Sequence, residues 1–128
     1  MSDAETTVAE LRELVQRFVA ERDWHRFHAP KNLAMSMAIE AAELMEHFQW
    51  ITTDASRRVG EEESKLVAIG EEIADVLCYL LAMANELDLD ISTTVRRKME
   101  RNAAKYPAEE YRGRYGPDDP GTSAPPVA

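Results

Sequence analysis

The sequence predicts a small all-α protein, and two observations carry that prediction. Apolar residues recur at three- and four-residue spacing in four separate segments, which is the repeat of one face of a helix. Short polar breaks divide these segments, and no stretch shows the alternating pattern of a strand. At 128 residues the chain is expected to form one domain with a modest core. Four helices of uneven length favour a four-helix bundle.

The first helix is expected to begin after Thr7, because Glu10 stands three residues later and completes a capping-box pattern. Its apolar side comprises Val8, Leu11, Val15, Phe18 and Val19. The pattern breaks over residues 24–31, where Pro30 disfavours a helical conformation for Ala29.

The second helix is expected to run from about Leu33 to Trp50, with Asn32 as its candidate N-cap. Its apolar side comprises Leu33, Met37, Ala41, Leu44, Met45 and Phe48. The polar residues 52–60 that follow are interpreted as a loop.

The third helix is the longest and is expected from about Glu61 to Leu87. Its wide apolar stripe comprises Leu66, Ile69, Ile73, Val76, Leu77, Leu80 and Met83. This stripe is wider than one short partner helix would cover, so a second copy of the chain is expected to complete the core.

A short break at residues 88–90 precedes the fourth helix, which either Asp90 or Ser92 would cap. The fourth helix is expected to end near Tyr106, because Pro107 cannot continue it.

Residues 1–112 are expected to form the domain, because residues 113–128 are rich in glycine and proline and predict a disordered tail. The longest apolar run, Val76–Ala84, is too short to cross a bilayer, and the N-terminus lacks the pattern of a signal peptide. We therefore expect a cytoplasmic protein without a membrane partner. Cys78 lies in the apolar run and is expected to be a small buried hydrophobe, not half of a disulfide.

The charge balance points away from nucleic acid as a partner. The chain has 15 basic and 24 acidic residues, a formal net charge of −9 and a pI near 4.8. An acidic surface repels a phosphate backbone, so duplex DNA or RNA is not an expected partner. An acidic protein that handles a nucleotide usually needs metal ions between its carboxylates and the phosphates.

Four acidic residues stand on the core side of the second and third helices. Glu40 and Glu43 are three residues apart and leave the same helix face, and Glu40 belongs to an otherwise apolar row. Glu72 and Asp75 repeat this spacing at the border of the apolar stripe. A carboxylate in such a position costs free energy unless something compensates its charge.

Two interpretations of these acids are open from the residues alone. If the two helices face each other, the carboxylates converge and raise one another's pKa. Mg²⁺ would relieve that conflict, because it prefers oxygen ligands and keeps positions for water and phosphates. Alternatively, a chain with 24 acidic residues acquires this spacing on ordinary solvated faces, as Glu10 and Glu13 show. Two core-side pairs on consecutive long helices favour the metal site.

Several blocks of the sequence resemble one family. Glu40 and Glu43 form an E-x-x-E motif, and Glu72 and Asp75 form an E-x-x-D motif after a spacer of 28 residues. This pair of motifs resembles the MazG superfamily of all-α nucleotide pyrophosphohydrolases. Flanking blocks are similar to its dCTP pyrophosphatase branch at residues 21–33, 46–50, 75–80 and 98–107. The resemblance covers residues 8–112 in order.

The resemblance implies a four-helix fold, a homo-oligomer in which a tetramer is favoured over a dimer, and dependence on Mg²⁺, with Mn²⁺ as a substitute. It also implies hydrolysis of a nucleoside triphosphate, dCTP or a 5-modified dCTP, to the monophosphate and pyrophosphate, which would clean the nucleotide pool. By matching position, the metal ligands would be Glu40, Glu43, Glu72 and Asp75. Glu40 is also the expected general base.

The resemblance also implies which residues bind the substrate. It suggests that Lys98, Asn102 and Lys105, which lie on adjoining rows of the fourth helix, hold phosphates and sugar. Lysines near a helix C-terminus can instead merely complement the helix dipole. The expected base pocket comprises Trp24, His28, Trp50 and Tyr79. For a tryptophan, the alternative role is that of a helix-end anchor in a small core.

Two alternatives compete with this function. A di-iron carboxylate bundle requires Glu-x-x-His on two helices, and no Glu-x-x-His occurs in the sequence. A catalytically silent bundle that binds nucleotides or protein partners is the second alternative. The presence of all four acids of the motif argues against it.

Overall fold

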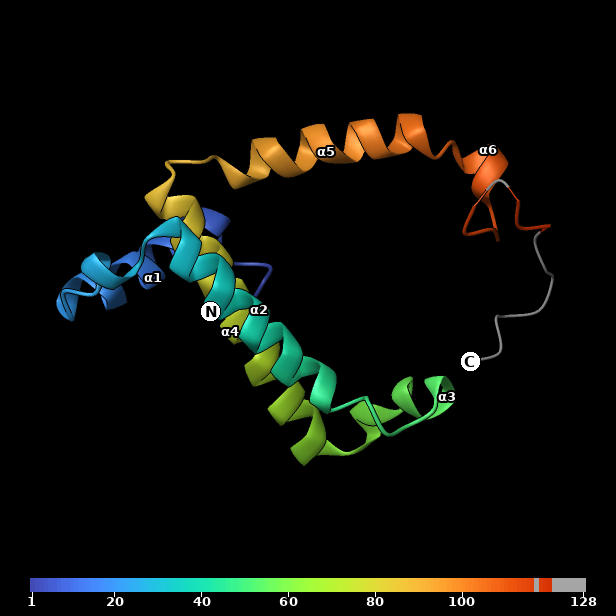
Figure 1. Ribbon diagram of the computed structural model, residues 1–128, viewed down its shortest axis with the longest axis horizontal. Coiled ribbons are helices and arrows are strands. Elements are labelled where there is room, and N and C mark those ends of the chain that lie inside the picture. Colours follow the sequence, from blue (N-terminus) through green and yellow to red (C-terminus); the bar gives the residue numbers. More distant parts are fainter. Residues whose placement is uncertain (117, 121–128) are drawn as a thin grey trace. The chain divides into compact units, whose positions relative to one another are not determined.

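The computed structural model describes residues 1–116 and 118–120. The chain divides into two compact units, the first over Met1–Leu89 and the second beginning at Asp90. Within the described residues every regular element is a helix, which confirms the predicted all-α class (Figure 1). The predicted domain limits, 1–112, stay a prediction.

Three long helices form the first unit. They are α1 (Val8–Glu21), α2 (Pro30–Glu46) and α4 (Glu63–Glu86). Helices α2 and α4 lie side by side, and α1 packs against α4 (Figure 1). Three short elements occupy the connections: η1 (His25–Phe27), α3 (Thr53–Ser56) and η2 (Val59–Glu61).

Helix α1 begins as its sequence predicts. The backbone N–H of Glu10 donates to Thr7 Oγ1 over 3.2 Å, and the backbone N–H of Thr7 donates to Glu10 Oε2 over 2.6 Å. Two of the N–H groups that a helix start leaves without partners are thereby satisfied.

Helix α2 differs from its prediction at both ends. It begins earlier, at Pro30, because proline has no N–H to satisfy and its fixed φ suits the first turn of a helix. Asn32 is therefore no cap, and its side chain donates instead to the carbonyl of Phe27 over 3.2 Å. The helix ends at Glu46, not at Trp50, because the N–H groups of His47, Phe48 and Ile51 bond three residues back and tighten the chain into turns.

The segment predicted as a loop, residues 52–60, contains the single helical turn α3 and most of η2. Thr52 caps α3, since its Oγ1 accepts from the backbone N–H of Ala55 over 3.1 Å. One turn is too short to show a 3.6-residue repeat, so the sequence pattern could not reveal it.

A polar clamp joins α1 to the C-terminal end of α4. The guanidinium of Arg12 donates to Asn85 Oδ1 over 3.0 Å and to the carbonyls of Leu89 and Ala84 over 2.7 and 3.2 Å. Asn85 returns a bond to the Arg12 carbonyl over 3.0 Å. Carbonyls at a helix end need partners, and a cation there also complements the helix dipole.

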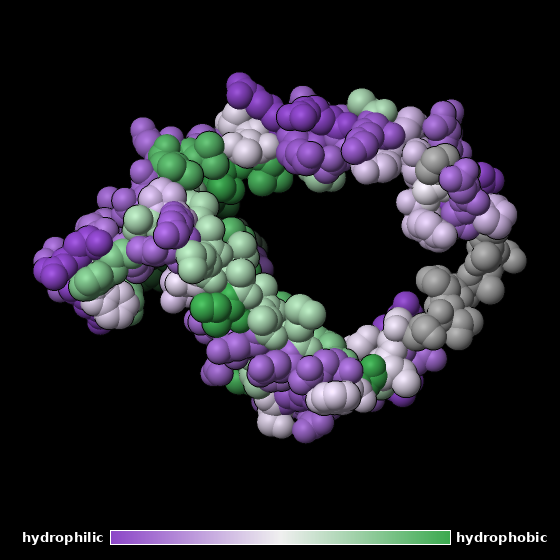
Figure 2. Space-filling model, in the orientation of Figure 1, coloured by the Kyte–Doolittle hydropathy of each residue, from purple (hydrophilic) through white to green (hydrophobic). Residues whose placement is uncertain are grey.

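The core of the first unit is small. Its buried apolar residues are Val19, Leu33, Ile69, Leu81, Ala82 and Ala84. One face of α4 stays open, with exposed fractions between 41% and 52% at Leu66, Ile73, Leu77 and Leu80. Apolar side chains accordingly reach the surface of this unit (Figure 2). Completion of the core by a second copy stays a prediction.

The prediction that Cys78 is buried is wrong for the single chain, in which this residue is exposed. Cys78 stands nine residues after the buried Ile69, which at about 100° per residue places it on the opposite side of α4. The apolar run around Cys78 therefore surrounds the helix and does not mark one buried face.

The second unit contains α5 (Ile91–Lys105) and the short α6 (Ala108–Tyr111). Asp90 is the N-cap of α5, because its Oδ1 accepts from the backbone N–H of Thr93 over 2.8 Å. Helix α5 ends before Pro107, as predicted, and its surface is mostly hydrophilic (Figure 2).

The predicted tail, residues 113–128, lies partly outside the described residues, at 117 and 121–128. Its described residues form turns and no helix. None of the described helices combines the length and the apolar run needed to cross a membrane.

Replacement of Arg12 by alanine is expected to lower the free energy of unfolding by about 1–3 kcal/mol, because carbonyl and amide partners in the clamp lose a charged donor. Arg17→Ala is the matched control on the same helix. Arg17 forms an exposed ion pair with Glu13, so its loss should cost less than about 1 kcal/mol. Urea unfolding followed by circular dichroism measures both, and equal losses would contradict the assignment.

Candidate metal centre

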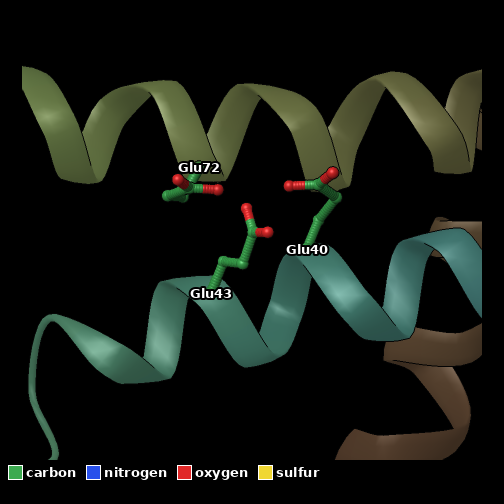
Figure 3. A group of neighbouring side chains, drawn as sticks. All are labelled: Glu40, Glu43 and Glu72. Atoms are coloured by element: carbon green, nitrogen blue, oxygen red, sulfur yellow. The ribbon is translucent and has the colours of Figure 1, made fainter.

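Three glutamates converge between the two long helices of the first unit. Glu40 and Glu43 lie one turn apart on α2 and point toward α4, and Glu72 points back from α4 (Figure 3). One carboxylate oxygen from each residue lies within 4.8 Å of the others. The sequence spacing predicted this juxtaposition, because residues three apart on a helix share a face.

Burial makes this cluster unlike an ordinary acidic surface. Glu40 and Glu72 are half-buried, whereas Glu43 is exposed. The Oε2 atoms of Glu40 and Glu72 are buried and have no hydrogen-bond partner in the described part of the chain. A buried carboxylate oxygen without a partner carries a desolvation cost. The three glutamates therefore need a positive charge or hydrogen-bond donors to offset this cost.

The first unit offers no such charge by itself. Among residues 1–89, no lysine, arginine or histidine forms a salt bridge with Glu40, Glu43 or Glu72. A proton or a bound cation would supply the missing charge.

The pKa values of Glu40 and Glu72 reflect both their burial and the repulsion between neighbouring negative charges. Burial raises the pKa of Glu40 to about 7, with contributions from its hydrogen bond to Glu43 and from the neighbouring negative charges. Burial also raises the pKa of Glu72, followed by the charge of Glu43. A cation between the helices would relieve this conflict.

Asp75, the fourth predicted ligand, is not among the three converging carboxylates. It is exposed and lies one turn beyond Glu72 on α4. Its charge nevertheless raises the pKa of both Glu40 and Glu72. Asp75 therefore lies within electrostatic reach of the cluster, and its role as a ligand stays a prediction.

The three glutamates fit a hard divalent cation. Carboxylate oxygens are the ligands that Mg²⁺ prefers, and a site with a few carboxylates leaves positions for water and phosphate oxygens. The buried, unpartnered Oε2 atoms of Glu40 and Glu72 are the atoms such an ion would satisfy.

Two of the predicted base-binding residues lie together near η1. The ring centroids of Trp24 and His28 are 6.3 Å apart. Trp24 also meets Phe18 edge to face at 5.6 Å and is 41% exposed. A partly exposed tryptophan ring of this kind can stack on a planar ligand.

The first unit does not bring all the predicted base-binding residues together. Trp24 precedes α2, and Trp50, which is 88% exposed, follows it. A helix of 17 residues is roughly 25 Å long at 1.5 Å per residue. Tyr79 is half-buried on α4, one turn beyond Asp75. A pocket that contains both tryptophans would therefore need a second copy of the chain.

The predicted phosphate-binding residues belong to the second unit. Lys98 and Lys105 are exposed on α5, and Lys105 Nζ lies 5.4 Å from the ring centroid of Tyr106. Asn102 is half-buried, and its Nδ2 contacts Met99 Sδ at 3.8 Å. Their roles as substrate ligands stay predictions.

One charged pair near the aromatic residues was not identified from the sequence. His25 Nδ1 lies 2.8 Å from Glu86 Oε1, although 61 residues separate the two in the chain. No local spacing signals such a pair, so only the packing of η1 on α4 reveals it.

Comparison with known proteins agrees with the all-α fold. The family model described as MazG-like matches residues 35–115, a range that contains the three converging glutamates and α5. The chain therefore belongs to the MazG-like family.

Two named relatives and one solved structure are similar to this chain. The chain is 40% identical over 104 residues to human dCTP pyrophosphatase 1 and 38% identical over 109 residues to the rat protein of that name. These alignments cover 81% and 85% of this chain, but 61% and 64% of the relatives. A crystal structure of a pyrophosphatase from Archaeoglobus fulgidus superposes with a TM-score of 0.71 at 43% identity, covering 77% of this chain and 91% of the other.

The metal-free protein is expected to lose stability as the pH rises from about 5 to about 8. Because the pKa of Glu40 is raised to about 7 in the folded chain, the folded chain keeps a proton that the unfolded chain has already released. The stabilisation is fully present below the unfolded pKa and is lost as the pH rises through the folded pKa. Urea unfolding in EDTA at several pH values measures this slope.

Excess Mg²⁺ is expected to oppose this loss, because the cation takes the place of the proton. Glu40→Gln should flatten the pH dependence in EDTA, since glutamine cannot titrate. An unchanged slope in this variant would show that other groups cause the pH dependence.

Proposed function

We propose that this chain is a Mg²⁺-dependent nucleotide pyrophosphatase that hydrolyses dCTP or a 5-modified dCTP to the monophosphate and pyrophosphate. The observation that carries the proposal is the pair of buried, unpartnered carboxylate oxygens of Glu40 and Glu72 beside Glu43. The names of the relatives, dCTP pyrophosphatase 1 and pyrophosphatase, support it.

In this proposal, Glu40, Glu43 and Glu72 hold the cation, with Asp75 as a further ligand and Mn²⁺ as a substitute ion. The bound ion supplies neutralisation of the triphosphate charge. Convergence of two ligands from α2 and one from α4 makes the site depend on the packing of these helices.

Glu40 is the proposed general base. Its carboxylate takes a proton from a water molecule as the water oxygen bonds to the α-phosphorus. The bond between that phosphorus and the bridging oxygen breaks, and the electron pair leaves with pyrophosphate. The half-buried position of Glu40 beside the proposed metal site suits this role, because a carboxylate oxygen not occupied by the cation can accept the proton of the attacking water.

Substrate recognition is proposed for two further groups of residues. Lys98 and Lys105 would supply point charges to the phosphates, and Asn102 would direct a hydrogen bond to the sugar or a phosphate. The residues proposed to surround the base are Trp24, His28, Trp50 and Tyr79. Nucleic acid is not a proposed partner, because the chain carries a formal net charge of −9.

A homo-oligomer, with a tetramer favoured over a dimer, is the proposed working form. Two observations support it. The exposed face of α4 leaves apolar side chains in water, and their burial against another copy would be favourable. In addition, Trp24 and Trp50 lie at opposite ends of α2. House-cleaning of the nucleotide pool in the cytoplasm is the proposed biological role.

The first test is pyrophosphate release from a panel of canonical and modified nucleoside triphosphates, with Mg²⁺ and with EDTA. We expect Mg²⁺-dependent release with preference for dCTP. Glu43→Gln should lower kcat/KM by at least about 100-fold, because one charged ligand is lost from the site. Glu46→Gln, one turn further along α2, is the matched control and should retain activity.

The outcomes of this test separate the alternatives. Turnover of another nucleotide would keep the mechanism and remove the proposed base preference. Tight nucleotide binding without hydrolysis would favour a catalytically silent binding module. If Glu43→Gln and Glu46→Gln lower kcat/KM equally, the loss comes from the reduced negative charge of this surface and not from a missing metal ligand.

The oligomer is tested by Leu77→Lys on the exposed face of α4. A lysine there places a charge in the proposed contact, so we expect a smaller species in analytical ultracentrifugation at equal protein concentration. Glu71→Lys, on the opposite side of the same helix, should leave the mass unchanged. A parent protein that sediments as a monomer would overturn the proposed oligomer.

A further inference from the structure

The segment between α1 and α2, residues 22–29, carries Trp24 and His28 with little support from the core. It contains no fully buried residue, and Asp23 adopts a positive φ of 51° as the chain leaves α1. Its backbone contacts are mainly local, such as the bond from the Trp24 N–H to the carbonyl of Val19 over 3.0 Å. Something beyond these turns must hold the two rings in one place.

The ion pair between His25 and Glu86 supplies that support. His25 stands between Trp24 and His28 in the chain, so a contact at His25 restrains both neighbours. Its Nδ1 lies 2.8 Å from Glu86 Oε1, with the His25 side chain 47% and the Glu86 side chain 28% exposed. A hydrogen bond of this length connects the segment directly to the end of α4.

The position of Glu86 indicates that its contact with His25 does more than stabilise α4. Glu86 is the last residue of α4, where a negative charge opposes the helix dipole. A glutamate there is unfavourable for α4 by itself, and its hydrogen bond with the His25 ring offsets part of that cost. The adjacent residue, Asn85, is held by Arg12, so Glu86 is attached to a fixed part of the fold.

A small cavity of about 10 Å³ lies where the segment meets α1 and α4. Among its lining residues are His25, His28 and Glu86, together with Gln16 of α1. His28 Nδ1 is buried and has no hydrogen-bond partner in the described residues. His28 therefore lines the same small cavity as His25 and Glu86, so a movement of the segment would change the surroundings of its ring.

We propose that the His25–Glu86 ion pair is a positioning device that holds the Trp24 and His28 rings for contact with the nucleobase. His25 and Glu86 act through these rings and are positioning residues, not substrate ligands. The inference rests on the proposed nucleotide pyrophosphatase function and adds two residues that determine how well the base is bound.

The restraint itself can be measured without nucleotide. The chain has two tryptophans, so Trp50→Phe leaves Trp24 as the fluorescent reporter. In this background, His25→Ala should raise the acrylamide quenching of Trp24 toward the value of the urea-unfolded protein. Arg26→Ala is the matched control in the same segment, because Arg26 contacts the neighbouring Phe27 ring and not α4. If Trp24 is quenched equally in His25→Ala and in its parent, the contact between His25 and Glu86 does not restrain Trp24.

The role in base binding is measured by steady-state kinetics with dCTP and Mg²⁺ in chains that retain Trp50. We expect His25→Ala to raise KM roughly tenfold while kcat changes less than about threefold, because the metal site on α2 and α4 is untouched. His25→Lys again places a hydrogen-bond donor near Glu86 and should recover most of the affinity.

A reversed pair gives the sharpest control. Glu86→Lys alone should raise KM, and adding His25→Glu should lower it again, although both variants alter α4 in the same way. Equal KM in the single and double variants, or a fall in kcat at unchanged KM, would overturn the proposal. Thermal unfolding of every variant identifies a general loss of fold.

Failure of this inference differs from failure of the proposed function. If the parent protein releases no pyrophosphate from any nucleotide, the function fails and the base-binding role fails with it. The quenching experiment still decides whether the ion pair holds the segment. If the parent is active and His25→Ala matches it in KM, the function stands and the positioning role falls.

Discussion

Two long helices pack closely when the surface between them is apolar or when its charges are balanced. Helices α2 and α4 meet that condition over much of their contact, but glutamates from both helices interrupt it. Burial and mutual repulsion raise the pKa of Glu40 and of Glu72, so the helix pair is not electrostatically complete by itself. A proton at low pH would complete it, and so would the proposed divalent cation at neutral pH. Metal binding would then be coupled to folding.

The rest of the first unit supports this pair of helices from one end. Helix α1 packs on α4, and the Arg12 clamp holds the last turn of α4 and the carbonyl of Leu89. The segment with Trp24 and His28 connects α1 to α2 and touches the same end of α4 through Glu86. The other end of the pair has no comparable set of long-range polar contacts among the described residues, and it carries the exposed Trp50.

Much of this could be predicted from the sequence, because local rules control it. The capping pair at Thr7 and the cap at Asp90 depend on residues three apart, and the 3.6-residue repeat locates the long helices. The convergence of the glutamates was predicted from the three-residue spacing within each acidic pair and from the assumption that the two helices face each other. What escaped prediction depends on tertiary structure. No pattern links His25 to Glu86, a single turn such as α3 has no periodicity, and the exposure of Cys78 depends on which face of α4 meets α2.

The deepest residues of the core stand at short, fixed intervals from the acidic ones. Leu33, which is 1% exposed, lies seven residues before Glu40, and the buried Ile69 lies three residues before Glu72. A helix turns by about 100° per residue, so one inserted or deleted residue within either interval would swing a glutamate away from its partners while the core stayed in place. Substitutions in these intervals can be absorbed, but changes of length cannot. The connection between the helices, residues 47–62, is under no such restriction, and length variation among related chains should concentrate there.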